Sequence, residues 1–314
     1  MKKYLNMRKQ IKILFNAFWN RFFTDEPINI TFFKDIFSDL AETVLITDNL
    51  EEVNNVDIIV NSLCGPTVKR DNAINILFAG EPYYEKDGWD IVLSGLDETV
   101  YKQAINTPLF ISYMYCNNLL DKCSNRPKRT TIPSKFCCFI TSNDKCVERN
   151  NLFFLINSYK KVDSVGQAFN TVGYYLIPSW GSPEFFEFIS QYKFVICAEN
   201  ANTDNYISEK IFHGYIPNIV PIYWGSEYAK TIFNPKSYIS LEESSEQSYI
   251  NLLQKVVELD NNDSKWLDMV NEPFLINNKL PEDIQIQSIR EKVADRISKL
   301  IINKTQIQDI SHGC

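Results

Sequence analysis

Short runs of apolar residues recur along the first half of the chain, and each run predicts a buried strand. They read IKILF, TVLIT, DIIVN, NILFA and DIVLS, and they begin at residues 11, 43, 57, 75 and 90. Strands that are apolar along their whole length, instead of at every second position, are typical of parallel sheets covered on both faces. The pattern therefore predicts an α/β domain with a parallel sheet.

Strands and helices alternate in the second half of the chain. Apolar runs that begin at residues 135, 193 and 219 predict strands, and apolar residues at helical spacing predict helices over 147–162, 248–259 and 284–301. A further helix is predicted to begin near Asn205 and to run through Phe212. This βαβ rhythm predicts a second doubly wound unit, so the sequence indicates two Rossmann-like domains.

The stretch DKCSNRPKRTTIPSK, residues 121–135, is polar and basic and contains two prolines. Such a composition is typical of a loop, and this stretch is the predicted linker. We therefore expect an N-terminal domain over residues 1–130 and a second domain over 131–275. The remaining residues, 276–314, are expected to form a helical tail that could cross back to the first domain.

Charge and composition exclude several classes of protein. The formal net charge of −7 argues against nucleic acid as the main partner, because phosphate contacts need a basic face. With two histidines and no CxxC pair, the chain offers no zinc ligand set, and its eight cysteines are interpreted as free thiols. No apolar run is long enough for a transmembrane helix, so we expect a soluble, cytoplasmic protein. The GxGxxG and GxxxxGK[ST] motifs are absent, which disfavours dinucleotide dehydrogenases and P-loop NTPases.

Two cations fall at equivalent positions, where a predicted strand passes into a predicted helix. Arg149 opens the helix after FCCFITSN, whose turn carries Ser142 and Asn143, and Lys210 lies in the opening turns of the helix after FVICAEN. A lysine at a helix N-terminus is unfavourable unless an anion lies beside it. Together, the two cations and two helix N-termini predict a diphosphate site. The alternative, that both cations are solvated surface residues, stays open from the sequence alone.

Three carboxylates lie at or near predicted strand ends. Glu81 follows NILFAG, Glu199 ends FVICAEN, and Glu209 precedes Lys210. Since the chain is so poor in histidine, acid–base chemistry would fall to such carboxylates. Each of them can also be a plain turn residue.

Several stretches resemble one family. Residues 192–226, YKFVICAENANTDNYISEKIFHGYIPNIVPIYWGS, resemble the donor-binding motif of the α1,3-fucosyltransferases, glycosyltransferase family 10. Residues 134–166 resemble a second block of that family, and LFAGEP at 77–82 resembles its short GEN or GES motif. The resemblance implies a GT-B fold, in which two Rossmann-like domains face a cleft. It also implies GDP-fucose as the donor, bound mainly by the second domain, and inversion at the anomeric carbon.

The resemblance also implies roles for residues. The family's general base falls on Glu81 and its diphosphate-binding arginine on Arg149. Glu209 is implied as a second catalytic carboxylate, which holds a sugar hydroxyl or offsets positive charge in the transition state. Donor binding is implied for the matching motif positions, together with the turn before Arg149: Ser142, Asn143, Val165, Gly166, Glu199, Asn200, Tyr206, Ser208, Glu209 and Lys210. Two departures are Val165, where the family usually has glycine, and Pro82, in the GEP triplet.

No metal is required in this interpretation, and a divalent metal would at most stimulate the reaction. The expected partners are a GDP-sugar and an oligosaccharide or glycoconjugate acceptor that contains GlcNAc or glucose, in a bacterial cell or a virus-infected host cell. Two alternatives remain: a transferase that uses another nucleotide-diphosphate sugar, and a non-catalytic relative that binds nucleotide sugars.

Overall fold

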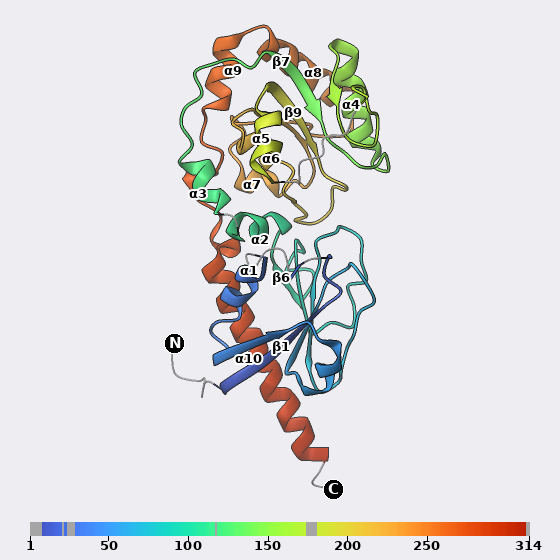
Figure 1. Ribbon diagram of the computed structural model, residues 1–314, viewed down its shortest axis with the longest axis vertical. Coiled ribbons are helices and arrows are strands. Elements are labelled where there is room, and N and C mark those ends of the chain that lie inside the picture. Colours follow the sequence, from blue (N-terminus) through green and yellow to red (C-terminus); the bar gives the residue numbers. More distant parts are fainter. Residues whose placement is uncertain (1–7, 21, 24–28, 117, 174–180, 312–314) are drawn as a thin grey trace. The chain divides into compact units, whose positions relative to one another are not determined.

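The computed structural model describes residues 8–20, 22–23, 29–116, 118–173 and 181–311, which form two compact units (Figure 1). Unit 1 comprises Met1–Asn117, Asp204–Tyr206 and Pro281–Cys314, and unit 2 comprises Asn118–Thr203 and Ile207–Leu280. Each unit is built around its own parallel sheet, so the predicted α/β class is confirmed.

Unit 1 contains a six-stranded sheet with the strand order β2-β1-β3-β4-β5-β6, in which all neighbours run parallel. Its strands are β1 (Arg8–Asn16), β2 (Ala41–Thr47), β3 (Ile58–Asn61), β4 (Ile74–Phe78), β5 (Ile91–Ser94) and β6 (Ala104–Asn106). The strands β3, β4 and β5 are buried along their whole length, which explains their continuous apolar runs. The five predicted strands are confirmed, whereas the short β6 left no recognisable pattern.

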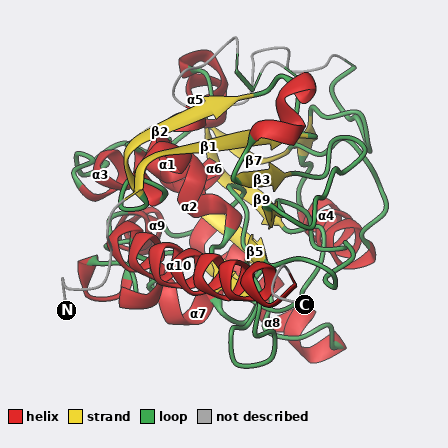
Figure 2. Ribbon diagram, turned by 90° about the horizontal axis from the view of Figure 1, so that it is seen from below, coloured by secondary structure: helices red, strands yellow, loops and turns green. Residues whose placement is uncertain are grey.

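The helices of unit 1 are α1 (Asn29–Ile36), α2 (Leu109–Cys116) and α10 (Ile286–Ser311), with 3₁₀ turns η1 (Leu50–Asn55) and η3 (Glu282–Ile284). The helix α10, red in Figure 1 and the longest helix in Figure 2, contacts α1, β4 and β6. Its residues Ile289, Val293 and Ile297 are fully buried. The apolar stripe predicted for this helix therefore packs against the core of unit 1.

Phenylalanine dominates the core beneath α1. The rings of Phe15 and Phe33 meet edge to face with centroids 5.0 Å apart, and Phe33 meets Phe78 in the same way at 5.1 Å. Such edge-to-face pairs are the arrangement that the ring quadrupole favours. The cluster fixes β1, β4 and α1 against one another.

Unit 2 contains a five-stranded sheet with the order β11-β10-β9-β7-β8, again parallel throughout. Its strands are β7 (Lys135–Phe139), β8 (Asp163–Ser164), β9 (Tyr192–Ala198), β10 (Val220–Trp224) and β11 (Ile239–Ser240). The three strands predicted in this region are confirmed. The strands β8 and β11 have two residues each, too few for a period in the sequence to reveal them.

The helices of unit 2 are α3 (Leu119–Ser124), α4 (Val147–Tyr159), α5 (Pro183–Ile189), α6 (Phe212–Tyr215), α7 (Ala229–Ile232), α8 (Glu246–Asp260) and α9 (Asp263–Val270), with one 3₁₀ turn, η2 (Ile276–Asn278). The helices predicted over 147–162 and 248–259 correspond to α4 and α8. Both carry apolar residues into the core of unit 2, among them Leu152, Ile156, Leu252 and Val256.

The helix predicted from Asn205 to Phe212 is wrong. Only α6, Phe212–Tyr215, is helical, and the backbone before it is irregular. The backbone N–H of Ser208 donates to the Glu199 carboxylate instead of to a helical carbonyl, at 2.8 Å. A side chain that captures backbone donors in this way competes with helix formation. Lys210 therefore lies in a turn just before α6 and not on a helix.

The polar stretch that the sequence suggested as a linker is held firmly on unit 2. Arg126 donates from Nη1 to the carbonyl of Tyr215 at 2.9 Å and from Nη2 to that of Val270 at 3.0 Å. Arg129 donates from Nη2 to the carbonyl of Ser190 at 2.9 Å. All three carbonyls lie at or just after the C-terminus of a helix, where a positive charge is favoured. The division between the units lies just before this stretch, between Asn117 and Asn118.

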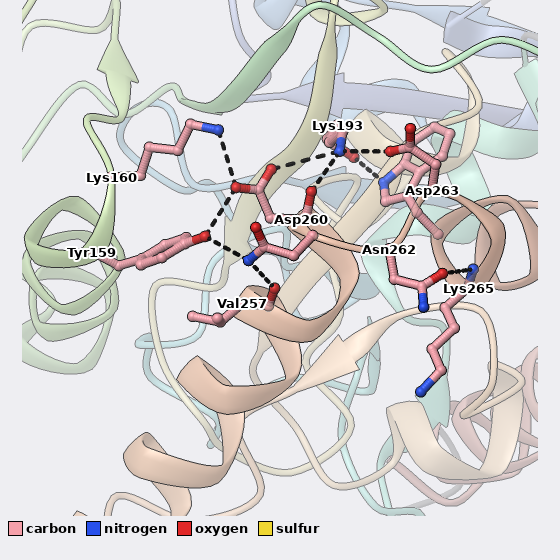
Figure 3. Close-up of polar contacts among 10 residues, drawn as sticks. Tyr159, Lys160, Lys193, Val257, Asp260, Asn262, Asp263 and Lys265 are labelled. Carbon is pink, nitrogen blue, oxygen red and sulfur yellow. Dashed lines mark hydrogen bonds and ion pairs between the residues drawn. The ribbon is translucent and has the colours of Figure 1, made fainter.

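A polar network joins α8 and α9 to β9 and α4 (Figure 3). Asp260, whose side chain is 6% exposed, lies 3.0 Å from Lys160 Nζ and accepts a hydrogen bond from the Tyr159 hydroxyl at 3.1 Å. Lys193 donates to the Asp260 carbonyl at 2.8 Å and to the Asp263 carboxylate at 3.1 Å. The network satisfies the C-terminal end of α8 and the first turn of α9.

None of the helices in the described part of the chain combines the length and the hydrophobicity that crossing a membrane requires.

The seven cysteines within the described residues are free thiols, and five of them are buried. Burial raises the pKa of thiols such as Cys138 and Cys197. These side chains therefore act as small apolar residues of the core.

Candidate active site

Arg149 lies in the first turn of α4 and its side chain is buried, although it carries a charge. It donates from Nη1 to Asn200 Oδ1 at 2.7 Å, and from Nη2 to the carbonyl and the Oδ1 of Asn143 at 3.0 and 2.9 Å. Asn143 follows β7 and Asn200 follows β9, and these neighbouring strands are parallel, so their carboxyl ends share one edge of the sheet. The structure thus brings together three of the residues that the sequence assigned to donor binding.

The Arg149 guanidinium is incompletely satisfied. Its buried Nε has no hydrogen-bond partner among the described residues, and the three acceptors on its Nη atoms are neutral amide oxygens. A buried charge that neutral groups hold in place is costly unless an anion completes the site. The arrangement is therefore suited to an anionic ligand with several oxygens.

The turn between β7 and α4 packs closely against the segment after β8. A Cβ atom at Gly166 would lie 2.1 Å from the carbonyl oxygen of Thr141, so only glycine fits there. The preceding Val165 is buried and its N–H donates to the Phe139 carbonyl at 3.1 Å. The Val165 side chain hence belongs to the core, and Ser142 is exposed at the surface of the turn.

Glu199 is fully buried and positions Lys210. Its carboxylate accepts from the N–H of Ser208 at 2.8 Å and from the Ser208 hydroxyl at 2.5 Å, and Lys210 Nζ lies 3.3 Å from Oε2. Lys210 also donates to the Ser208 hydroxyl at 2.9 Å. Burial raises the pKa of Glu199, while Lys210 and Ser208 oppose that rise by favouring the ionised form.

Two carboxylates and a second cation act on the Lys210 ammonium. Burial lowers the pKa of Lys210, but the negative charges of Glu199 and Glu209 outweigh it and the net shift is upward. Glu209 is partly exposed, with its Oε1 3.9 Å from Lys210 Nζ. The positive charge of Arg149 also reaches this lysine and opposes the upward shift. The two cations therefore lie within electrostatic range of each other in unit 2.

Two of the predicted residues belong to unit 1. Tyr206 is buried and lies in the short segment Asp204–Tyr206, which is fixed there because the Asn205 N–H donates to the Gly95 carbonyl at 2.8 Å. Glu81 is exposed and comes just after β4, at the carboxyl edge of the unit 1 sheet. The thiol of Cys64, which follows β3, lies within electrostatic range of Glu81. Burial raises the pKa of Cys64, and the negative charge of Glu81 raises it further.

The sequence did not indicate a cavity of about 330 Å³ in unit 1, at the carboxyl ends of β1 and β2. Its walls come from the aromatic stretch after β1 and from Asp48 and Leu50 after β2. The sequence contains the aromatic stretch NAFWNRFF that lines the cavity, but an aromatic run predicts a core as readily as a binding site.

Among the described residues, no group of three or more histidine, cysteine or acidic side chains could hold a metal ion.

Comparisons with known proteins agree with this arrangement. Residues 130–271 match the family model of glycosyltransferase family 10 (fucosyltransferase), C-terminal part. Protein R654 of Acanthamoeba polyphaga mimivirus, which is named as a fucosyltransferase, is 26% identical over 82% of this chain and 42% of its own length. The α-(1,3)-fucosyltransferase FucT of Helicobacter pylori is 33% identical over 44% of this chain and 27% of its own length. The chain thus spans less than half the length of these two relatives.

A crystal structure of an α1,3-fucosyltransferase with GDP superposes with a TM-score of 0.70, at 20% identity, over 95% of this chain and 93% of that chain. At this level of identity the likeness shows the fold, which is of the GT-B type. The family match covers most of unit 2, where Arg149 and Lys210 lie. Residues 130–271, most of unit 2, thus match glycosyltransferase family 10 (fucosyltransferase).

Proposed function

We propose that this chain transfers L-fucose from GDP-fucose to a hydroxyl of a glycan that contains GlcNAc or glucose, with inversion at the anomeric carbon. The observation that carries the proposal is the Arg149 guanidinium, buried, held by Asn143 and Asn200, and left with an unsatisfied Nε. The family match over residues 130–271 supports a nucleotide-diphosphate sugar as the anion that binds here.

Arg149 and Lys210 would bind the diphosphate of the donor. As the bond between C1 of the sugar and the phosphate oxygen breaks, negative charge builds up on the departing GDP. Fixed cations that face this charge stabilise the transition state without reorganisation. Glu209, partly exposed and 3.9 Å from Lys210 Nζ, would offset positive charge on the sugar ring or hold one of its hydroxyls.

Glu81 would act as the general base. It is an exposed carboxylate at the carboxyl edge of a parallel sheet, where ligands of α/β proteins bind. The acceptor hydroxyl would give its proton to Glu81 while its oxygen attacks C1 from the face opposite the leaving GDP. This single displacement inverts the configuration.

Calorimetry and kinetics on matched variants test the proposal. GDP should bind in the presence of EDTA, and Arg149→Ala and Lys210→Ala should each weaken binding by about 1.5–3 kcal/mol, the usual worth of a charge-assisted hydrogen bond. Lys161→Ala, which removes an exposed cation of the same unit, should leave the affinity unchanged. Wild-type affinity in both site variants would exclude this diphosphate site, and tighter binding of UDP would point to another donor.

Turnover tests the base. Glu81→Gln should lower kcat for transfer by about 10²–10⁴ with nearly unchanged GDP affinity, since positioned base catalysis is typically worth that factor. The control is Glu42→Gln, which changes an exposed glutamate at the opposite end of the unit 1 sheet. Transfer at the wild-type rate by Glu81→Gln would show that Glu81 is not the base. A wild-type protein that binds GDP-fucose but shows neither transfer nor slow hydrolysis would be a non-catalytic relative.

A further inference from the structure

The cavity of unit 1 lies at the carboxyl edge of its sheet, the edge where ligands of α/β proteins bind. The chain runs from β1 outward to β2 and then returns to β3 on the other side of β1, so the switch point of the sheet lies between β1 and β3. The cavity lies beside this point, on the β2 side of β1. It is about 330 Å³ in volume and is formed by the end of β1 and by residues that follow β1 and β2. This volume lies in the range of small-molecule sites.

The lining combines aromatic faces with open polar groups. The rings of Phe18, Trp19, Phe22 and Phe23 contribute the aromatic walls, and Asn20 and Asp48 contribute an amide and a carboxylate. Asn20 and Asp48 are exposed, and neither side chain makes a hydrogen bond or ion pair with another described residue. The cavity therefore offers flat apolar surfaces next to unused donors and acceptors.

This combination matches the chemistry of a sugar ring. One face of a pyranose presents C–H groups, which pack on an aromatic face through dispersion and the ring's negative quadrupole. Its rim presents hydroxyls, for which a carboxylate and an amide are suitable partners. A purely apolar occupant would leave the Asp48 carboxylate desolvated, and a phosphate would be repelled by it.

The wall of the cavity is fixed in advance. Ala17, directly after β1, has a φ of 58°, a left-handed conformation that costs a non-glycine residue about 1–2 kcal/mol. Its carbonyl accepts from the Cys64 N–H at 2.8 Å, and Asn16 Nδ2 donates to Asn61 Oδ1 at 2.7 Å. The loop after β3 thus holds the strained turn that directs the following residues over the sheet edge. Strain that is maintained in this way commonly marks a binding site.

We propose that this cavity binds a sugar unit of the acceptor glycan, and that this unit is a neighbour of the one that carries the reacting hydroxyl. The inference rests on the proposed function for the identity of the acceptor. Two strand steps separate β1 from β4, after which Glu81 lies, so the cavity and the base are ~10 Å apart along the sheet edge. A base must lie within about 3 Å of the oxygen that it deprotonates. The cavity consequently sets the preference for extended acceptors and takes no part in the proton transfer.

Acceptor length tests the proposal. Trp19→Ala and Asp48→Asn should each raise KM for N-acetyllactosamine by about tenfold, a loss of ~1.4 kcal/mol of binding. KM for N-acetylglucosamine, donor hydrolysis and GDP affinity should stay unchanged. Trp19→Phe, which keeps an aromatic face, should retain most of the disaccharide preference. Leu45→Ala, on the exposed side of β2 and outside the cavity, is the matched control. Equal rises in KM for both acceptors would overturn the proposal.

An NMR binding experiment tests whether the cavity binds a sugar, and it does not depend on catalysis. In the wild-type protein, N-acetyllactosamine should shift the Trp19 indole N–H resonance, assigned by its loss in Trp19→Phe, and Asp48→Asn should weaken that binding. No shift at saturating disaccharide, or a shift with octanoate or adenosine instead, would overturn the sugar assignment. A protein that fails to bind GDP would overturn the proposed function, whereas the indole shift would still report on the cavity.

Discussion

Glu199 shows how a residue can belong to a binding motif while its side chain is fully occupied by neighbouring residues. The sequence assigned both Glu199 and Lys210 to donor binding. In the structure Glu199 is fully buried and its oxygens are occupied by Ser208 and Lys210, whereas the Lys210 side chain is 21% exposed. Glu199 is therefore a positioning residue for Lys210. A motif records which residues occur together, but it does not record which of them faces the solvent.

The ion pair between Glu199 and Lys210 predicts how substitutions at these residues change the free energy of unfolding. Lys210→Met removes the cation beside a fully buried carboxylate and should lower the free energy of unfolding by about 2–3 kcal/mol, below the full cost for a completely buried pair. Adding Glu199→Gln removes the uncompensated charge and should restore part of the loss. Urea titration of both variants, with Lys161→Met as a surface control, measures this coupling. Simple additivity of the two substitutions would contradict the pairing.

His213 predicts a pH dependence. It is buried in α6, and burial lowers its pKa to about 4. Between pH 6.5 and 4 the unfolded chain takes up a proton at this residue and the folded chain does not, so stability is lost as the pH falls. At pH 5 the loss relative to pH 7.5 should be about 2 kcal/mol. His213→Gln should lack this part of the pH dependence in urea titrations. The raised pKa of Glu199 acts in the opposite direction, but it is present in both proteins.

At the scale of elements, the sequence predicts the strands that are buried on both faces. It does not predict a backbone conformation that a single side-chain hydrogen bond decides. Continuous apolar runs identified β1 to β5, β7, β9 and β10, because parallel strands are buried on both faces. The helix expected before α6 failed because the Glu199 carboxylate captures the Ser208 N–H, and no apolar period reveals that contact. The linker prediction overlooked that Arg126 and Arg129 hold the stretch on backbone carbonyls of unit 2.

The close packing of the turn between β7 and α4 predicts that one substitution there lowers both stability and GDP affinity. In Gly166→Ala the new methyl carbon would lie 2.1 Å from the Thr141 carbonyl oxygen, which is backbone and cannot move cheaply. The substitution should cost about 1–3 kcal/mol, as overpacking does, and should displace the turn that carries Asn143. We expect a lower melting temperature together with weaker GDP binding. Gly65→Ala, whose nearest contact would be an ordinary 3.6 Å, is the control. Unchanged GDP affinity in Gly166→Ala would separate this turn from the donor site.

At the scale of the molecule, the sequence identified the two α/β halves, and three of the residues that it proposed for donor binding lie together in the structure. The trio Arg149, Asn143 and Asn200 is assembled from two strand ends that the apolar runs had located. The segment Asp204–Tyr206 was not predicted to belong to unit 1, because chain continuity places it inside the donor motif. The aromatic cavity was missed for a different reason: aromatic side chains that line a site and those that fill a core have the same pattern in sequence.

The two units have separate cores, and this predicts separable stability. Ile297 on α10 is fully buried in unit 1, whereas Ile302, five residues further along the same helix, is 55% exposed. Ile297→Ala should destabilise unit 1 by about 2–5 kcal/mol, the usual cost of emptying a core position, while Ile302→Ala should cost about 0.5 kcal/mol or less. Because a local loss speeds hydrogen exchange mainly in its own cooperative unit, amides of β3, β4 and β5 should exchange faster in Ile297→Ala. Those of β7, β9 and β10 should keep their wild-type rates. Equal acceleration in both sheets would mean that the units unfold as one, and equal effects of the two substitutions would contradict the packing of α10 on the unit 1 sheet.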